Sequence, residues 1–284
     1  MRLRIAGLTI AVSTDDPALT LTVDAPSAKF LVNGDGPADV DIAVERVASM
    51  PEASSETIFD SGGTWALFDD GGRFRIDCKA PSFGDAPYKV AFFDRDYSAG
   101  RVLMRADVFE GPAEPLQYPI DELLVGNLLA RGRGVELHCC GIIGPDGLGR
   151  IFVGQSGAGK TTTARLWLGH RNDIEIVSDD RVILRESGGQ WRMYGTPWHG
   201  DAELASPSSA PLAAIYLLQQ APATRVVDVG RAAAAARLFG CTFPLFYDAS
   251  ALAFTVDCIG RITGDVPVRV LEFTPDPSAI EAVQ

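Results

Sequence analysis

The sequence predicts a mixed protein of the α/β or α+β class, with a β-rich N-terminal domain over residues 1–115 and an α/β domain with a mixed sheet over residues 116–284. Three observations predict this fold. The first 112 residues hold short runs of β-favouring residues between glycine-rich turns. The segment 110–115 has the glycine and proline of a linker. From Val135 onward, apolar strand-like runs alternate with helical patterns, and 284 residues suffice for two cores.

Hairpins are the main elements expected in the first domain. One joins residues 64–68 to 73–77 across a glycine-rich turn, and another joins residues 89–93 to 101–106. Residues 1–12 combine arginines with a short apolar run, which could be a signal peptide. The run alternates and no clear cleavage motif follows, so a β-strand is favoured. The first domain shows no cluster of catalytic residue types, and we interpret it as a docking or scaffolding domain.

The second domain is expected to alternate strands and helices, with added hairpins. The expected helices cover residues 119–130, 161–168, 231–238 and 251–262, and the expected strands cover residues 135–143, 150–153, 174–177, 182–185, 190–194, 212–218 and 268–273.

Composition excludes several classes of partner. The net charge of −12 disfavours nucleic acid and anionic membrane surfaces. No segment approaches the roughly 20 apolar residues of a membrane span. The number of cysteines, five, is odd, and no two of them form a C-x-x-C pair. This pattern indicates reduced thiols in the cytoplasm. Lysine is found only at positions 29, 79, 89 and 160, so an anion site must concentrate its cations locally.

A glycine-rich loop follows the expected strand 150–153 and matches the pattern G-x-x-x-x-G-K-[ST]. Its glycines let successive backbone N–H groups turn toward phosphate oxygens, and the helix that follows points its positive end at the same anion. Lys160 reaches the β and γ phosphates, and the Thr161 hydroxyl ligates Mg²⁺. The residues expected to bind the phosphates of a nucleoside triphosphate are Gly154, Gln155, Ser156, Gly157, Ala158, Gly159, Lys160, Thr161 and Thr162.

Two adjacent carboxylates, Asp179 and Asp180, follow the apolar strand 174–177. A nucleotide loop needs an acid at the end of a neighbouring strand to hold Mg²⁺, and a second acid can accept a hydroxyl proton. We name Asp179 as the candidate metal ligand beside Thr161, although the sequence leaves open which acid takes which role. A solvated turn is the alternative. His138 lies in an apolar strand, where a histidine is usually a satisfied core residue.

Three blocks stand in order, namely His138 on a strand, the loop 154–161, and Val177-Ser-Asp-Asp-Arg-Val182. Together they resemble the catalytic domain of HPr kinase/phosphorylase and its relatives, over about residues 135–200. The fold of that domain is similar to the P-loop domain of ATP-dependent phosphoenolpyruvate carboxykinase, whose loop also reads G-K-T-T, as residues 159–162 do here.

The resemblance implies an ATP-dependent kinase that transfers the γ-phosphoryl group to a hydroxyl, with a serine on a peptide or protein as acceptor. It implies ATP and Mg²⁺ as cofactors, catalytic roles for Asp179, Asp180, His138 and Lys160, and a homo-oligomer. Thr161-Thr162 departs from the Ser-Glu that HPr kinases carry after the lysine, and their later phosphorylase signature is absent. These departures disfavour HPr itself as substrate and the reverse reaction. Kinases that modify a serine on a small ribosomal peptide share the layout more closely.

The acceptor side is expected in the segment Tyr194–Glu203, where glycines and a proline shape a turn. His199 and Asp201 offer polar groups and Trp198 a stacking surface, while a plain structural connection explains the segment equally well. Arg181 and Arg192 are candidate phosphate contacts or ordinary surface residues. Two further functions stay open: a kinase acting on a small metabolite, and a non-catalytic nucleotide-binding regulator.

Overall fold

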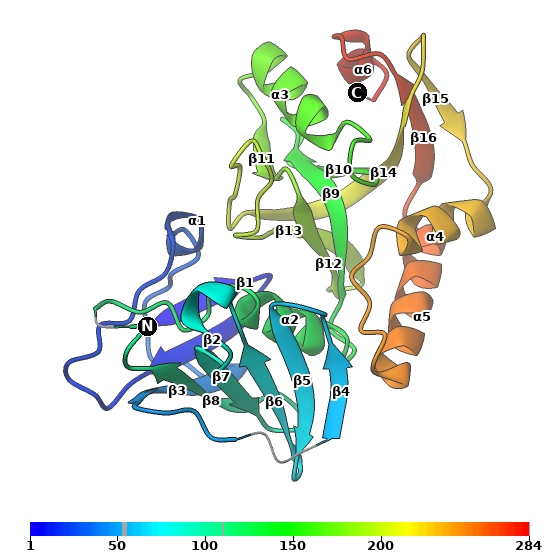
Figure 1. Ribbon diagram of the computed structural model, residues 1–284. Helices are drawn as coiled ribbons and strands as arrows, with labels where there is room; N and C mark the ends of the chain where they lie inside the picture. Colours follow the sequence, from blue (N-terminus) through cyan, green and yellow to red (C-terminus); the bar gives the residue numbers. More distant parts are fainter. Residues whose placement is uncertain (53–55, 110, 284) are drawn as a thin grey trace. The chain divides into compact units, whose positions relative to one another are not determined.

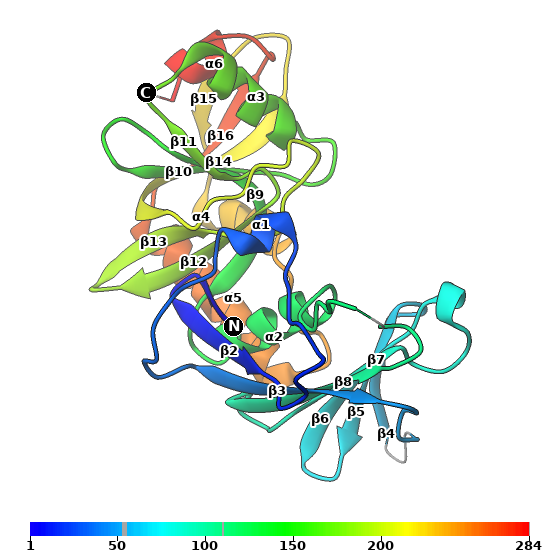
Figure 2. The ribbon, with the colours of Figure 1, turned by 90° about the vertical axis from the view of Figure 1, so that its left-hand side faces the viewer.

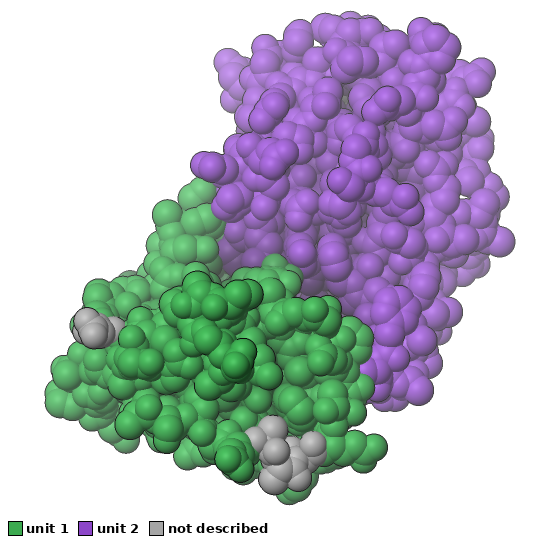
Figure 3. All heavy atoms as spheres, viewed as in Figure 1, with its two compact units in different colours: residues 1–128 green, residues 129–284 purple. Residues whose placement is uncertain are grey.

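The computed structural model describes residues 1–52, 56–109 and 111–283. It divides into two compact units, Met1–Leu128 and Leu129–Gln284 (Figure 3). Both units are built on large mixed sheets, so the mixed α/β class is confirmed. Glu110, the first residue of the predicted linker, lies outside the described residues.

A single mixed sheet organises the first unit, in the strand order β1-β2-β3-β8-β7-β6-β5-β4 (Figure 2). Strands β2 and β8 pair parallel with β3, and the other neighbours pair antiparallel. The elements are β1 (Arg2–Ile5), β2 (Leu8–Ser13), α1 (Ala25–Ala28), β3 (Val40–Val47), β4 (Glu56–Asp60), β5 (Trp65–Asp70), β6 (Arg73–Cys78), the 3-10 helix η1 (Pro81–Phe83), β7 (Lys89–Phe93), β8 (Ala99–Arg105) and α2 (Ile120–Leu129), whose last residue belongs to the second unit.

The hairpins expected in the first unit are confirmed, with shifted ends. β5 pairs with β6 up to Asp70 opposite Arg73, so the turn shrinks to Gly71 and Gly72, whose φ angles of 60° and 97° suit glycine. The N-terminal run forms two strands instead of one, because Ala6 and Gly7 adopt positive φ and turn the chain back.

The first unit extends past the predicted boundary at residue 115. Lys89 is fully buried, and its Nζ donates to the carbonyl oxygens of Glu114 at 3.0 Å and Gln117 at 3.5 Å. A buried ammonium needs such acceptors, and these bonds tie the chain beyond the linker to the first sheet. The compact unit that contains this segment runs from Met1 to Leu128.

A second mixed sheet organises the second unit, in the order β10-β9-β12-β13-β14-β16-β15 (Figure 1). β11 adds to β9, and β10 also pairs parallel with β14, which in turn pairs parallel with β16. The elements are β9 (Val135–Ile143), β10 (Gly149–Val153), α3 (Lys160–His170), β11 (Glu175–Ser178), β12 (Arg181–Ser187), β13 (Gln190–Gly195), β14 (Ser209–Gln220), β15 (Arg225–Asp228), α4 (Arg231–Phe239), α5 (Ala249–Asp265), β16 (Val268–Phe273) and α6 (Ser278–Glu281). The predicted elements are present, and only the short β15 and α6 were not expected.

Helices cover this sheet on both faces. One core cluster joins the sheet to α4 and α5, and the other joins it to α3 and α6 (Figure 1). Alternation along β10 explains the division, because Ile151 and Val153 enter the first cluster while Phe152 enters the second. Cys139 and Cys140 divide in the same way, and all five cysteines are free and buried.

Among the described residues, no helix combines the length and apolar character needed to cross a bilayer.

Candidate functional site

The glycine-rich loop connects the end of β10 to the first residue of α3, Lys160. Gly157 and Gly159 have φ angles of 80° and 110°, which side chains other than glycine rarely adopt. A Cβ on Gly159 would lie 2.7 Å from the Phe273 ring, and one on Gly154 would lie 2.5 Å from the Ala158 Cβ. The backbone conformation and the close packing of the loop thus both require glycine. The N–H groups of the loop lie directly before the N-terminus of a helix.

Lys160 folds back across the loop that precedes it. Its Nζ donates to the carbonyl oxygens of Gly154 at 3.0 Å and Gln155 at 3.2 Å, and the residue is buried. Burial lowers the pKa of its ammonium, while the charge of Asp180 acts in the opposite direction. The ammonium is therefore held beside the loop by weak neutral acceptors, which an anion can replace.

A pocket of about 360 Å³ lies beside the loop, and we call it the acidic pocket. Most of the sequence-predicted catalytic residues meet here, although they come from β9, α3 and the turn between β11 and β12. Its lining includes His138, Lys160, Thr161, Thr162, Asp180 and Asp201.

His138 and Asp180 form a pair in the acidic pocket, with 3.0 Å between Nε2 and Oδ1. The pairing follows from the sheet, because Arg181 of β12 stands opposite His138 of β9 and the Cys139 N–H donates to the Asp180 carbonyl. The hydrogen bond from His138 holds the pKa of the Asp180 carboxyl below its ordinary value, helped by the charges of Arg181 and Lys160 and opposed by burial. His138 is only partly buried, so it is not the satisfied core histidine of the alternative interpretation.

Asp179 does not line the acidic pocket and is 1% exposed. Its Oδ1 accepts the N–H groups of Gly200 at 3.0 Å and Leu204 at 3.3 Å, and its Oδ2 accepts that of Ala202 at 3.0 Å. Both oxygens are thus engaged in ordering the segment 200–204. The geometry favours Asp180 over Asp179 as the carboxylate that can meet a ligand.

The segment Tyr194–Glu203 contributes to the site through its end. Gly200 and Asp201 line the acidic pocket, while the His199 ring nitrogen Nδ1 lies 3.0 Å from the Gly200 carbonyl oxygen. A Cβ on Gly200 would approach the Asp179 Oδ2 to 2.8 Å, so this contact requires glycine. The Trp198 carbonyl accepts hydroxyl hydrogen bonds from Ser178 at 3.2 Å and from Thr196 at 3.3 Å.

The two candidate arginines lie in different surroundings, and only Arg181 lies beside Asp180. Arg181 bonds to Glu136 at 3.1 Å, lies 3.4 Å from the Asp180 Oδ2 and covers the Phe243 ring. Arg192 donates to the hydroxyl of Ser209 at 3.2 Å and does not line the acidic pocket. Arg181 therefore supports the carboxylate of the site.

Metal ligation can be tested against the donors present. In the described part of the chain, no group of three or more His, Cys, Asp and Glu side chains is arranged to hold a metal ion. Mg²⁺ in phosphate sites keeps several waters and takes one or two protein ligands plus phosphate oxygens. Thr161 and Asp201 line the same pocket, and this sparse oxygen set fits Mg²⁺ that arrives with a polyphosphate.

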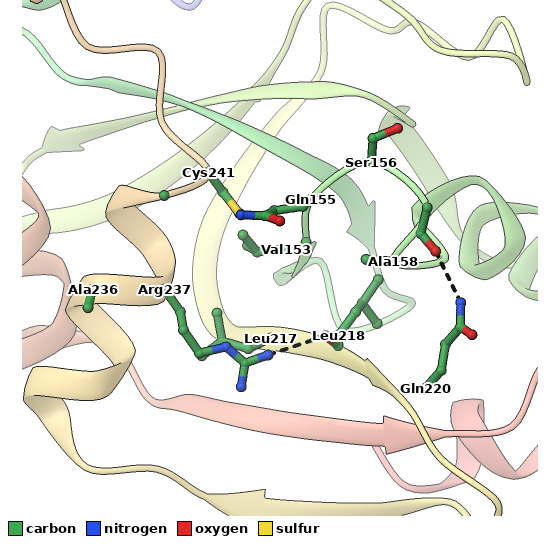
Figure 4. A pocket seen from close by; sticks show the side chains of 13 residues that line it. Val153, Gln155, Ser156, Ala158, Leu217, Leu218, Gln220, Ala236, Arg237 and Cys241 are labelled. Carbon is green, nitrogen blue, oxygen red and sulfur yellow. Dashed lines mark hydrogen bonds between the residues drawn. The ribbon is translucent and has the colours of Figure 1, made fainter.

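A larger pocket of about 670 Å³, the β14-side pocket, lies along the same loop (Figure 4). Strand β14 and helix α4 contribute Leu217, Leu218, Gln220, Ala236 and Arg237 to its lining. None of these residues belongs to a motif, so sequence reasoning missed them. The pairing of β14 with β10 brings the strand residues to the loop, and the hydrogen bond from Arg237 to the Leu218 carbonyl links α4 to them.

No protein-family model matches the chain, and no curated protein matches it. Function is therefore inferred from the site and not from kinship.

Proposed function

We propose that the protein is an ATP-dependent kinase that transfers the γ-phosphoryl group to a hydroxyl, with a serine of a peptide or protein as acceptor. One observation carries the proposal: the acidic pocket gathers Lys160 and Thr161 beside the His138–Asp180 pair. A phosphate loop alone serves many functions. A partly exposed, ionised carboxylate in the same pocket is what transfer to an acceptor hydroxyl requires.

In the proposed reaction, the loop amides and Lys160 bind the phosphates of ATP, and the Lys160 ammonium exchanges its two carbonyl acceptors for phosphate oxygens. Asp180 orients the acceptor hydroxyl and takes its proton. The acceptor oxygen bonds to the γ-phosphorus as the bond to the β,γ-bridging oxygen breaks, and ADP leaves. Mg²⁺, held by Thr161 and Asp201, would neutralise charge on the phosphate oxygens.

His138 acts through Asp180 in this scheme. Its hydrogen bond fixes the orientation of the carboxylate and favours its ionised form. Arg181, near the other carboxylate oxygen, has the same effect. Asp180 is therefore a weak base that is held in a fixed orientation. This suits phosphoryl transfer, because positioning of the acceptor contributes more to that reaction than proton abstraction does.

The proposal is tested by measuring transfer from radiolabelled ATP to serine-containing peptides and, in parallel, to small hydroxyl compounds. Lys160→Ala is expected to lower transfer by about 10² to 10³, because a charge that stabilises the transferred group is lost. Lys79→Ala, at an exposed lysine of the first unit, is the matched control and should transfer normally. Undiminished transfer by Lys160→Ala would refute the proposal. Acceptor-independent phosphate release alone would indicate a nucleotide-hydrolysing regulator instead.

The pH profile reports on the His138–Asp180 pair. Because His138 lowers the pKa of Asp180, the carboxylate stays ionised as the pH falls, and activity persists into acid. In His138→Phe the pKa of Asp180 rises, so the acid limb of the kcat/KM profile is expected to move to higher pH. Steady-state kinetics between about pH 3 and 8 measures this shift, a range that spans the ordinary aspartate pKa of about 3.9. A uniform loss of rate with an unmoved limb would mean that His138 has only a structural role.

A further inference from the structure

The two pockets meet at the glycine-rich loop. Ser156, Gly157 and Gln220 line both of them. The Gln220 side chain is held at the junction, because its Nε2 donates to the Gly157 carbonyl at 3.0 Å (Figure 4). A phosphate chain bound on the loop therefore borders a pocket on each side, and a nucleoside attached to it can extend into only one of them.

The acidic pocket is a poor place for a nucleoside. It is the smaller of the two, and the carboxylates of Asp180 and Asp201 belong to its wall. A base and ribose placed there would cover the pair formed by His138 and Asp180 and leave no room for an acceptor. This pocket suits the γ-phosphoryl end and the acceptor hydroxyl.

The β14-side pocket has the opposite character. Leu217, Leu218 and Ala236 give it apolar walls, and its described lining residues include no carboxylate. Its volume of about 670 Å³ lies within the usual range of small-molecule sites. Apolar pockets of this size bind flat organic groups, and a purine base is such a group.

Arg237 supplies a cation to this pocket from α4. Its Nη2 donates to the Leu218 carbonyl at 3.3 Å, and no carboxylate within the described residues pairs with it. The side chain extends from the helix across the floor formed by Leu217 and Leu218 (Figure 4). A planar guanidinium held in this way can stack on an aromatic base or meet the ribose.

We infer that the β14-side pocket binds the nucleoside part of the nucleotide, with Leu217 and Ala236 against the base and Arg237 as its cationic contact. The nucleotide then lies across the loop, with its nucleoside along β14 and its γ-phosphoryl group facing Asp180. This inference rests on the proposed nucleotide-dependent function and adds the residues that recognise the nucleoside.

The test compares ATP with inorganic tripolyphosphate, which has the phosphates without the nucleoside. Calorimetric titration in the presence of Mg²⁺ is expected to show that ATP binds the unmodified protein about tenfold or more tightly than tripolyphosphate. Ala236→Leu fills the pocket from an exposed helical position, where leucine keeps helix propensity. It should weaken ATP binding by about tenfold and leave tripolyphosphate binding unchanged.

Ala232→Leu is the matched control, because Ala232 is exposed on the same helix and does not line the pocket. It should change neither affinity, and thermal unfolding checks that both variants fold. Unchanged ATP binding in Ala236→Leu, or equal weakening of both ligands, would overturn the placement of the nucleoside while phosphoryl transfer by the unmodified protein still stands. If the unmodified protein binds neither ligand, the proposed function itself fails.

Discussion

Asp180→Asn is expected to lower the rate of phosphoryl transfer by about 10³ or more, with nucleotide affinity changed by less than about threefold. The amide keeps the shape of the side chain and a contact with His138, but it cannot accept the acceptor proton. Asp180 does not touch the loop carbonyls that hold Lys160, so the phosphate contacts persist. Single-turnover transfer and calorimetric ATP binding measure the two effects separately.

Asp173→Asn is the matched control for this result. Asp173 belongs to the same unit, is ion-paired with Arg171 at the surface, and does not line the acidic pocket. Its substitution should leave transfer unchanged. If Asp180→Asn retained more than about a tenth of the rate, the carboxylate would not be the group that orients the acceptor, and Asp201 would be the next candidate in the pocket.

Asp179→Asn is expected to disorder the segment that brings Asp201 to the site. The carboxylate accepts hydrogen bonds from three N–H groups. In asparagine the amide nitrogen replaces one of the two oxygens, and as a hydrogen-bond donor it cannot accept a bond from a backbone N–H. Breaking a buried charge-assisted hydrogen-bond network in this way lowers the free energy of unfolding by about 3 kcal/mol. Amide hydrogen exchange at Gly200, Ala202 and Leu204 should accelerate by about tenfold or more, and transfer should fall with it.

The same variant separates two roles for Asp179. If this residue also held Mg²⁺, as the sequence suggests, Asp179→Asn would in addition raise the Mg²⁺ concentration needed for half-maximal rate, whereas loss of the three N–H contacts alone would leave that concentration unchanged. Asp180→Asn serves as the comparison, because it changes a neighbouring carboxylate that accepts none of these N–H groups. Its exchange pattern in the segment 200–204 should match that of the unmodified protein.

Local patterns determined much of this protein. The motif at residues 154–161 predicts a loop between a strand and a helix, and β10 and α3 stand there because apolar alternation and helical periodicity act over a few residues. The glycines at 71–72 determined a hairpin for the same reason, since positive φ is a property of single residues. The sequence also determined that His138 and the two aspartates lie in strands or their ends.

Only the tertiary structure decided what these residues do. Asp179 and Asp180 are neighbours of identical chemistry in the turn between β11 and β12. The segments packed around that turn give them different partners, because Asp179 meets the N–H groups of residues 200–204 and Asp180 meets His138. The β14-side pocket and the boundary after Leu128 depend on contacts between distant segments, such as Gln220 with Gly157 and Lys89 with Glu114. Such contacts follow from packing and hydrogen bonding over the whole sheet, which no local pattern encodes.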